Sequence, residues 1–324
     1  MMTTDSTPHS RPMRSPFPEL ALDEPKVTSL PIRPRISDYF ELTKPRIAMM
    51  ALVTVAVGYL MGAAPTVNGW ILFNTLVGAG LVAAGGSALN CVIERRADIK
   101  MHRTRNRSVA VGRLSAAEAG AFAFSLTFVG TGILLVGVPN WQAAVAALLT
   151  FTLYVFVYTP LKRISAWNTV VGAVPGALPP VIGWCAARGD VTVEGLALFG
   201  ILFAWQLPHF YAIAWMHRVD YARGGMKMLP IVDQANGLWT GRATVATCLL
   251  LIATTIVPFT VQAAGMIYLV GSIVLGVWFL GRCITFARVR DDGTARRVLR
   301  GSLVHLLGVM VLLVADGVIP KFLS

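Results

Sequence analysis

The chain has 324 residues, of which 55% are hydrophobic and only 14% charged, and its mean hydropathy is +0.65. Soluble domains carry about a quarter charged residues, so this composition excludes a soluble globular fold and indicates an all-α polytopic membrane protein. The net charge of +12 does not indicate nucleic-acid binding, because the basic residues are distributed by membrane side. The four cysteines are scattered and form no CxxC pair, which excludes a disulfide framework and a zinc site.

Residues 1–36 form a polar, proline-rich segment that we expect to be a disordered cytoplasmic tail. The segment has no apolar core of the kind found in secretory signals, and its acidic residues argue against a transit peptide. We therefore expect the bacterial inner (plasma) membrane rather than an organelle. Arg35 to Arg46 is predicted to be a short interfacial helix at the start of a single membrane domain, residues 37–324.

Nine apolar runs of roughly 18 to 24 residues follow, each long enough to cross a bilayer as a helix. The predicted spans are Ile47–Ala64, Trp70–Ile93, Ala116–Val138, Trp141–Thr159, Trp167–Ala187, Gly195–Met216, Thr240–Gln262, Ala264–Phe286 and Gly301–Pro320. The intervening loops alternate, so that 26 of the 28 Lys and Arg residues fall on one side and only Arg188 and Lys321 on the other. This asymmetry predicts a cytoplasmic amino terminus and cytoplasmic basic loops in a multi-pass protein.

The first candidate site lies where the second span meets a basic loop. Asn90, Glu94 and Asp98 recur every four residues and therefore share one face of a helix. Oxygen ligands at this spacing, followed by guanidinium groups, suit Mg²⁺ that bridges to a diphosphate. The alternative is a solvated helix end with ordinary salt bridges, for example from Glu94 to Arg95 or Lys100.

A second polar cluster follows the sixth span. Asp220 lies in its basic loop, and two acidic helix ends on the same membrane side suit a diphosphate held between them through magnesium or shared waters. Taken alone, Asp220 would be an ordinary solvated partner of the loop. Pro208 predicts a break or bend that lines a cavity. His209 is expected to face that cavity, unless a neighbouring helix satisfies its imidazole.

A third element joins the fourth and fifth spans. Tyr158 and Lys162 lie one turn apart, so that a phenol and an ammonium can address the same anion. Lys162 and Arg163 would serve equally well as topology determinants. The glycines and prolines between Gly172 and Gly183 predict a kinked span that neighbouring helices approach closely.

Taken together, these motifs resemble the haem-farnesylating family within the UbiA-type intramembrane prenyltransferase superfamily. The resemblance covers about residues 38–320 and rests on the Asn90 to Asp98 stripe, the Tyr-Thr-Pro-Leu-Lys-Arg run at 158–163, and Pro208-His209-Phe210 before Asp220. It implies a nine-helix bundle around a lateral, membrane-open cavity. The sequence departs from the family pattern at Glu94, where many bacterial relatives have Asp, and at Ser108 and Lys227, where proline is common.

The resemblance also implies roles for individual residues. The catalytic and Mg²⁺-binding set would be Asn90, Glu94, Asp98 and Asp220. The diphosphate-binding set would be Arg103, Arg107, Tyr158, Lys162 and Arg163. The haem-binding or substrate-binding set would be His209, Tyr211 and Trp205.

The implied reaction is the transfer of an alkyl group from farnesyl diphosphate to haem B. Mg²⁺ and the basic side chains would take up charge on the leaving diphosphate, while the faces of Trp205, Phe210 and Tyr211 shelter the allylic cation. Attack by the haem vinyl group and addition of water would give haem O for terminal oxidases, with haem A synthase or the oxidase assembly as contacts. Two alternatives stay open: a superfamily member acting on a quinone precursor or chlorophyll, and a secondary transporter, which would place its polar groups at mid-membrane.

Overall fold

A computed structural model describes residues 35–323, and every regular element in this range is helical. The predicted tail therefore lies outside the described residues, except for its last two positions, and Ile36 already belongs to the first helix. The predicted interfacial helix at 35–46 is observed as α1, Ile36–Thr43, which ends at Lys44 in the left-handed conformation. Pro45 then starts α2 at a position where a missing N–H costs nothing.

Nine helical stretches in the described range are long and apolar enough to span a membrane, which confirms the predicted number. Six of these spans are each a single helix: α2 (Pro45–Ala63), α3 (Gly69–Asp98), α4 (Ala116–Gly137), α9 (Val193–Met216), α12 (Leu238–Thr260) and α13 (Met266–Val289). The fourth joins α5 (Gln142–Thr152), the π-helix η1 (Leu153–Tyr158) and α6 (Thr159–Leu161). The fifth pairs α7 (Asn168–Ala177) with α8 (Pro179–Arg188), and the last pairs α14 (Asp292–Gly317) with α15 (Ile319–Leu323).

Two predicted spans differ from the structure by five residues or more at one end, and the other seven differ by at most three residues at either end. The second continues past Ile93 to Asp98, so the whole carboxylate stripe lies on one uninterrupted helix. The last begins at Asp292 rather than Gly301, because Asp291 caps the helix by accepting a hydrogen bond from the Thr294 N–H. The first turns of α14, residues 292–300, are rich in arginine, so the hydropathy pattern placed them in the preceding loop.

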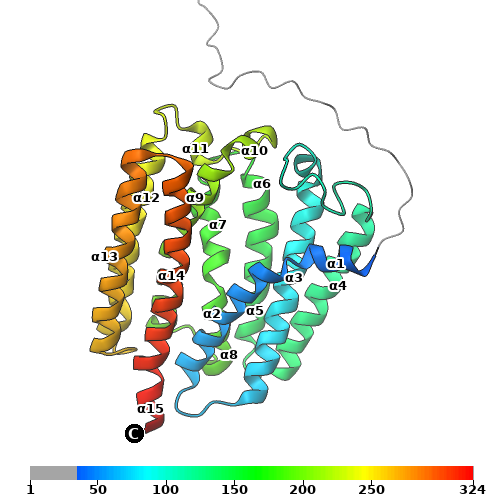
Figure 1. Cartoon of the computed structure of the whole chain (residues 1–324). Helices are drawn as coiled ribbons and strands as arrows, with labels where there is room; N and C mark the ends of the chain where they lie inside the picture. The colour runs from blue at the N-terminus through cyan, green and yellow to red at the C-terminus, as the bar shows by residue number, and fades with distance from the viewer. Residues whose placement is uncertain (1–34, 324) are drawn as a thin grey trace, which may run out of the picture. The chain divides into compact units, whose positions relative to one another are not determined.

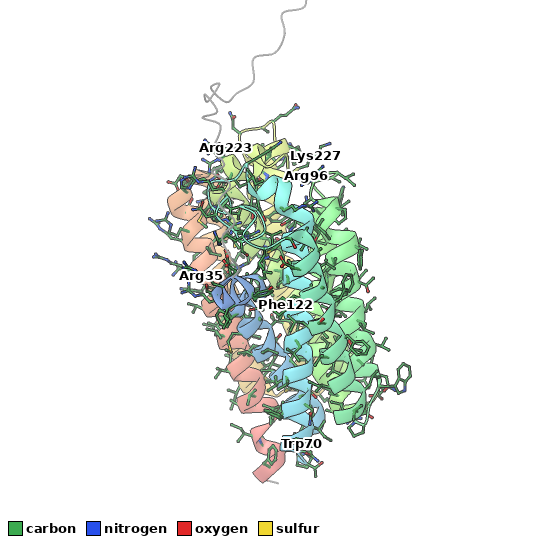
Figure 2. The ribbon with its side chains drawn as sticks, turned by 90° about the vertical axis from the view of Figure 1, so that its right-hand side faces the viewer. Arg35, Trp70, Arg96, Phe122, Arg223 and Lys227 are labelled. Carbon is green, nitrogen blue, oxygen red and sulfur yellow. The ribbon has the colours of Figure 1, made fainter. Side chains whose placement is uncertain are left out.

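Successive membrane-length spans run in opposite directions, so alternate loops gather at the same end (Figure 1). The short helices α10 (Arg218–Arg223) and α11 (Leu229–Val232) lie at the end where α3 and α9 finish. Figure 2 shows Arg96, Arg223 and Lys227 at this basic end and Trp70 at the opposite end. These three basic residues therefore lie at the end to which the charge distribution assigned the basic loops.

The fifth span is interrupted at Leu178, as its prolines predicted. Its glycines allow close packing: a Cβ at Gly183 would overlap the Val55 carbonyl of α2, and one at Gly176 would overlap the Gln206 side chain of α9. Pro208, in contrast, lies inside a continuous α9. Of the break or bend predicted there, the break does not occur, because α9 remains helical through the proline and packs along α7, α12 and α14.

Candidate functional site

The stripe on α3 is buried. Asn90, Glu94 and Asp98 expose only 1%, 6% and 1% of their surfaces, although they lie within the last three turns of the helix. A solvated helix end would leave its carboxylates in water. The structure therefore replaces that interpretation with an enclosed polar site, in which each charge requires a partner.

Each polar side chain of the stripe has a cationic partner from another part of the chain. The Lys44 Nζ donates to Asn90 Oδ1 at 3.0 Å, and the Lys162 Nζ donates to Glu94 Oε1 at 2.7 Å. One Arg107 nitrogen, Nη1, lies 2.9 and 2.8 Å from the two carboxylate oxygens of Asp98. The stripe is thus lined by three cations, and none of them is one of the nearby residues expected for ordinary salt bridges.

Lys162 is held by the helices around it. Its ammonium lies 4.5 Å from the centre of the Tyr158 ring, and that ring occupies space that a Cβ at Gly172 would fill. Burial disfavours the ammonium, but the adjoining Tyr158 and Glu94 outweigh burial and raise the pKa of Lys162. Lys162 therefore stays protonated, and the predicted pairing of Lys162 with Tyr158 occurs through the ring face.

The π-helical segment places Thr159 against the stripe. The Thr159 N–H bonds to the Tyr154 carbonyl five residues earlier, and Pro160, which follows, has no N–H of its own. As a result the Thr159 hydroxyl accepts a hydrogen bond from Asn90 Nδ2 at 3.1 Å while donating to the Tyr154 carbonyl at 2.8 Å. This contact fixes which way the Asn90 amide points, with its oxygen toward Lys44.

Asp220 bonds to the loop that follows the stripe. Its two carboxylate oxygens accept hydrogen bonds from the backbone N–H groups of His102 and Arg103, at 3.1 and 3.2 Å. Arg223 lies 3.8 Å away on the same short helix. Asp220 is therefore more than a solvated partner of its own loop, because it joins the polar cluster after α9 to the loop that follows the stripe.

Two further contacts join the basic loops. The Lys227 N–H donates to the Lys162 carbonyl at 2.7 Å, and the Lys227 carbonyl accepts from Asn168 Nδ2 at 2.9 Å. Beneath them lies a buried apolar cluster of Ala97, Met101, Ala214, Met226 and Met228. Lys227 thus contributes through its backbone, while its side chain is exposed.

An open hollow of ≈ 600 Å³ lies beside these loops at the basic end. Its basic lining residues are Arg96, Lys100 and Arg163, and Gly224 and Gly225 form part of its wall. Ala97 also lines it, directly before Asp98 on α3. Arg163, which the resemblance places in the diphosphate set, therefore faces this hollow, whereas Arg103 is exposed on the loop that Asp220 holds.

The residues predicted to contact haem or substrate lie deeper, on α9, and on different faces. Trp205 and His209 stack at 4.8 Å, and both bond to Ser302 of α14: Trp205 Nε1 donates to its carbonyl at 2.6 Å, and His209 Nδ1 lies 2.7 Å from its hydroxyl. Tyr211 instead packs against Ala173 of α7. His209 thus has a partner on a neighbouring helix, and the three residues do not share one surface.

The donor set suits a hard divalent cation that shares its coordination shell with substrate. Two carboxylates and an amide oxygen are the ligand types that Mg²⁺ accepts, and Mg²⁺ commonly takes only one or two protein carboxylates beside phosphate oxygens. Within residues 35–323, no group of three or more His, Cys, Asp or Glu side chains is arranged to hold a metal alone. The residues therefore fit a metal that binds together with a diphosphate.

Sequence patterns identified the stripe and His209 but missed three residues that bond to them: Lys44 and Thr159 at Asn90, and Ser302 at His209. Lys44 precedes the first span, and a lone basic residue there signals topology as readily as a ligand contact. Thr159 faces Asn90 only because of the π-helical segment. Ser302 carried no signal, because a lone serine at the second position of the predicted last span belongs to no spaced motif.

Comparison with known proteins identifies a family and its fold. The model of the UbiA prenyltransferase family matches residues 51–307. A protoheme IX farnesyltransferase from Solibacter usitatus is 44% identical over 289 residues, covering 86% of this chain and 98% of the relative. One from Koribacter versatilis is 39% identical over 318 residues, covering 95% and 100%.

Solved structures with the same fold are more distant in sequence. A digeranylgeranylglyceryl phosphate synthase structure aligns with a TM-score of 0.72 at 16% identity, covering 87% of this chain and 98% of that one. A UbiA homologue from Archaeoglobus fulgidus bound to DMAPP and Mg²⁺ aligns with a TM-score of 0.62 at 15% identity, covering 85% and 99%.

Proposed function

The chain belongs to the UbiA prenyltransferase family, and from this premise we propose that it transfers a farnesyl group from farnesyl diphosphate to the vinyl group of haem B, giving haem O and diphosphate. The names of its relatives supply the substrate pair. The observation that carries the chemistry is the buried stripe of Asn90, Glu94 and Asp98 with a cation on each member. Such an enclosed array of fixed charges is suited to stabilising a departing diphosphate.

The cations have the main role in binding the diphosphate. Lys44, Lys162 and Arg107 are held at the stripe by short hydrogen bonds, so little reorganisation is needed when phosphate oxygens arrive. Asn90, Glu94 and Asp98 would hold Mg²⁺, with Asp220 as a candidate from the second motif. When bound, Mg²⁺ supplies Lewis-acid neutralisation of charge on the diphosphate leaving group.

The remaining site residues position the loops or contact the substrates. Asp220 keeps the loop that carries Arg103 and Arg107 against the second motif. On α9, His209 and Trp205 present an imidazole and an indole beside Ser302, where they can contact the haem or the farnesyl chain. Trp205, which stacks on His209, and Tyr211, which packs toward α7, lie on different faces of α9, so only one of these two aromatic rings can shelter an allylic cation from water.

The location of the protein follows from the charge distribution. We place the multi-pass chain in the bacterial inner membrane with the basic end and the amino terminus in the cytoplasm, on the basis of the positive-inside rule. The diphosphate would then approach from the cytoplasmic side, where the hollow lined by Arg96, Lys100 and Arg163 opens. The haem product would pass to haem A synthase or to terminal oxidase assembly.

The direct test is to incubate the purified full chain with farnesyl diphosphate, Mg²⁺ and haem B, followed by mass analysis of the porphyrin. We expect haem to gain one farnesyl group and one hydroxyl group, and to remain unchanged when a chelator removes divalent cations. A parallel reaction with an aromatic quinone precursor provides the contrast. Prenylation of that acceptor with unmodified haem would contradict the assignment of haem as substrate.

A further inference from the structure

A second polar hollow, of ≈ 270 Å³, lies between α13 and α14. α13 stands on the opposite side of the bundle from α3, which carries the carboxylate stripe, and α14 lies between α13 and α2 (Figure 1). Six residues line it: Trp278, Gly281, Arg282, Thr285, Thr294 and Arg297. The proposed prenyl transfer has no use for this hollow.

Helical spacing builds the hollow. Its four residues on α13 recur at i, i+3, i+4 and i+7 and therefore share one face, while its two residues on α14 lie one turn apart. Gly301 provides the space, because a Cβ at that position would lie 2.7 Å from Cδ of Arg282. The Arg282 side chain thus crosses α14 where α14 has no side chain.

Among residues 35–323, neither guanidinium group in the hollow forms a salt bridge. The Arg282 group lies 4.1 Å from the Trp278 ring centre, and its buried Nε has no hydrogen-bond partner in the described part of the chain. The two acids nearest Arg297 at the start of α14 have other bonding partners: Asp292 pairs with Arg218, and Asp291 bonds to Thr294 while lying within electrostatic range of Arg297. A buried, unpartnered N–H is costly, so this site favours an acceptor from outside the chain.

The depth of the hollow matches the polar boundary of a bilayer. Arg282 lies seven residues before the end of α13, which corresponds to about 10 Å along the helix axis. Farther from the basic end, the outer face is apolar and exposed, with exposed fractions of 62% at Val274 and 53% at Val304. Trp278 lies between these two zones, as tryptophan does at membrane interfaces.

We propose that this hollow binds the phosphate group of an anionic phospholipid, with Arg282 and Arg297 as the cations and the acyl chains along the exposed apolar faces of α13 and α14. Basic pockets between membrane helices at the cytoplasmic side are suited to such headgroups. A lipid phosphate would pair with the guanidinium groups of Arg282 and Arg297, and its glycerol region would contact Trp278. The inference does not rest on the reaction that the enzyme catalyses.

The test is native mass spectrometry of the full chain in a neutral detergent, titrated with phosphatidylglycerol and with phosphatidylcholine of equal chain length. We expect phosphatidylglycerol to be retained preferentially, and Arg282→Gln to weaken its binding about tenfold. The matched control is Arg296→Gln, which removes the same charge from an exposed neighbour outside the hollow. Arg297→Gln, at another exposed position, gives a second variant should Arg282→Gln fail to fold.

Three results would overturn the proposal. The first is equal retention of phosphatidylglycerol by the hollow variants and the Arg296→Gln control. The second is equal binding of both lipids by the unaltered protein. The third is displacement of phosphatidylglycerol by millimolar inorganic phosphate, which would indicate a soluble anion in place of a lipid.

Discussion

The buried ion pair between Lys162 and Glu94 allows a quantitative test of the site. Their Nζ and Oε1 atoms lie 2.7 Å apart, and the two side chains are only 11% and 8% exposed. Glu94→Gln removes one charge and leaves the ammonium in a site with little water. Breaking a buried pair in this way costs about 3–5 kcal/mol, whereas replacing both partners with uncharged residues can be close to neutral.

The expected change in melting temperature follows from chain length. At about 2.1 cal/mol/K of unfolding entropy per residue, residues 35–323 correspond to about 0.6 kcal/mol/K, so a loss of 3–5 kcal/mol lowers Tm by about 5–8 °C. Thermal unfolding in detergent measures this for Glu94→Gln, for Lys162→Met and for the double variant. We expect the double variant to recover most of the loss seen in Glu94→Gln.

The exposed pair of Arg218 and Asp292 is the matched control. Arg218 Nη1 and Asp292 Oδ1 lie 2.6 Å apart, but the two side chains are 32% and 55% exposed. Asp292→Asn should therefore cost at most about 1 kcal/mol, or less than about 2 °C. A Tm shift in Glu94→Gln no larger than in Asp292→Asn, or a double variant as unstable as both single changes added, would refute a buried, mutually compensated pair.

Three further predictions address catalysis, packing and pH. Asp98→Asn should lower kcat by about 10²-fold or more with the fold intact, and near-normal turnover at limiting Mg²⁺ would leave the stripe a structural role only. Gly183→Ala should lower Tm because its Cβ would overlap the Val55 backbone, whereas Gly132→Ala, with open space around it, should not; equal Tm values would contradict the packing. Burial alone would raise the pKa of Asp38, but hydrogen bonds from the Arg35 N–H and the Arg113 side chain lower it below its ordinary 3.8. The ionised Asp38 should therefore stabilise the fold fully above about pH 4 and progressively less as the pH falls further. The Tm difference between the unaltered protein and Asp38→Asn should shrink in acid. A Tm difference that stays constant with pH would contradict the ionic role of Asp38.

The stripe could be predicted from sequence because its geometry is local. Residues four apart on a helix must share a face, so Asn90, Glu94 and Asp98 needed no knowledge of the rest of the fold. Their partners could not be found in the same way. Lys44 and Lys162 lie 46 and 68 positions from the residues they contact, and no periodicity relates a loop to a helix across such a distance.

The contacts of Ser108 could not be predicted from the sequence either. The resemblance identified it only as a departure from a family proline. In the structure its N–H donates to Glu41 at 3.3 Å and its hydroxyl to the Asp38 carbonyl at 3.4 Å, so it attaches α1 to the loop after α3. A proline has no N–H and could not make the first contact. The departure thus coincides with a bond that only a non-proline residue can form.

The charges around the stripe explain why a divalent cation suits this site. Lys44, Lys162 and Arg107 carry three positive charges, and Glu94 and Asp98 carry two negative ones, so the five groups leave a surplus of one positive charge. A diphosphate brings more negative charge than this surplus can offset. In a buried site the remaining charge would be costly, and a divalent cation arriving with the diphosphate removes it. The same balance accounts for the stability of the site before substrate binds, since each carboxylate already has its own cation and neither is left unpaired.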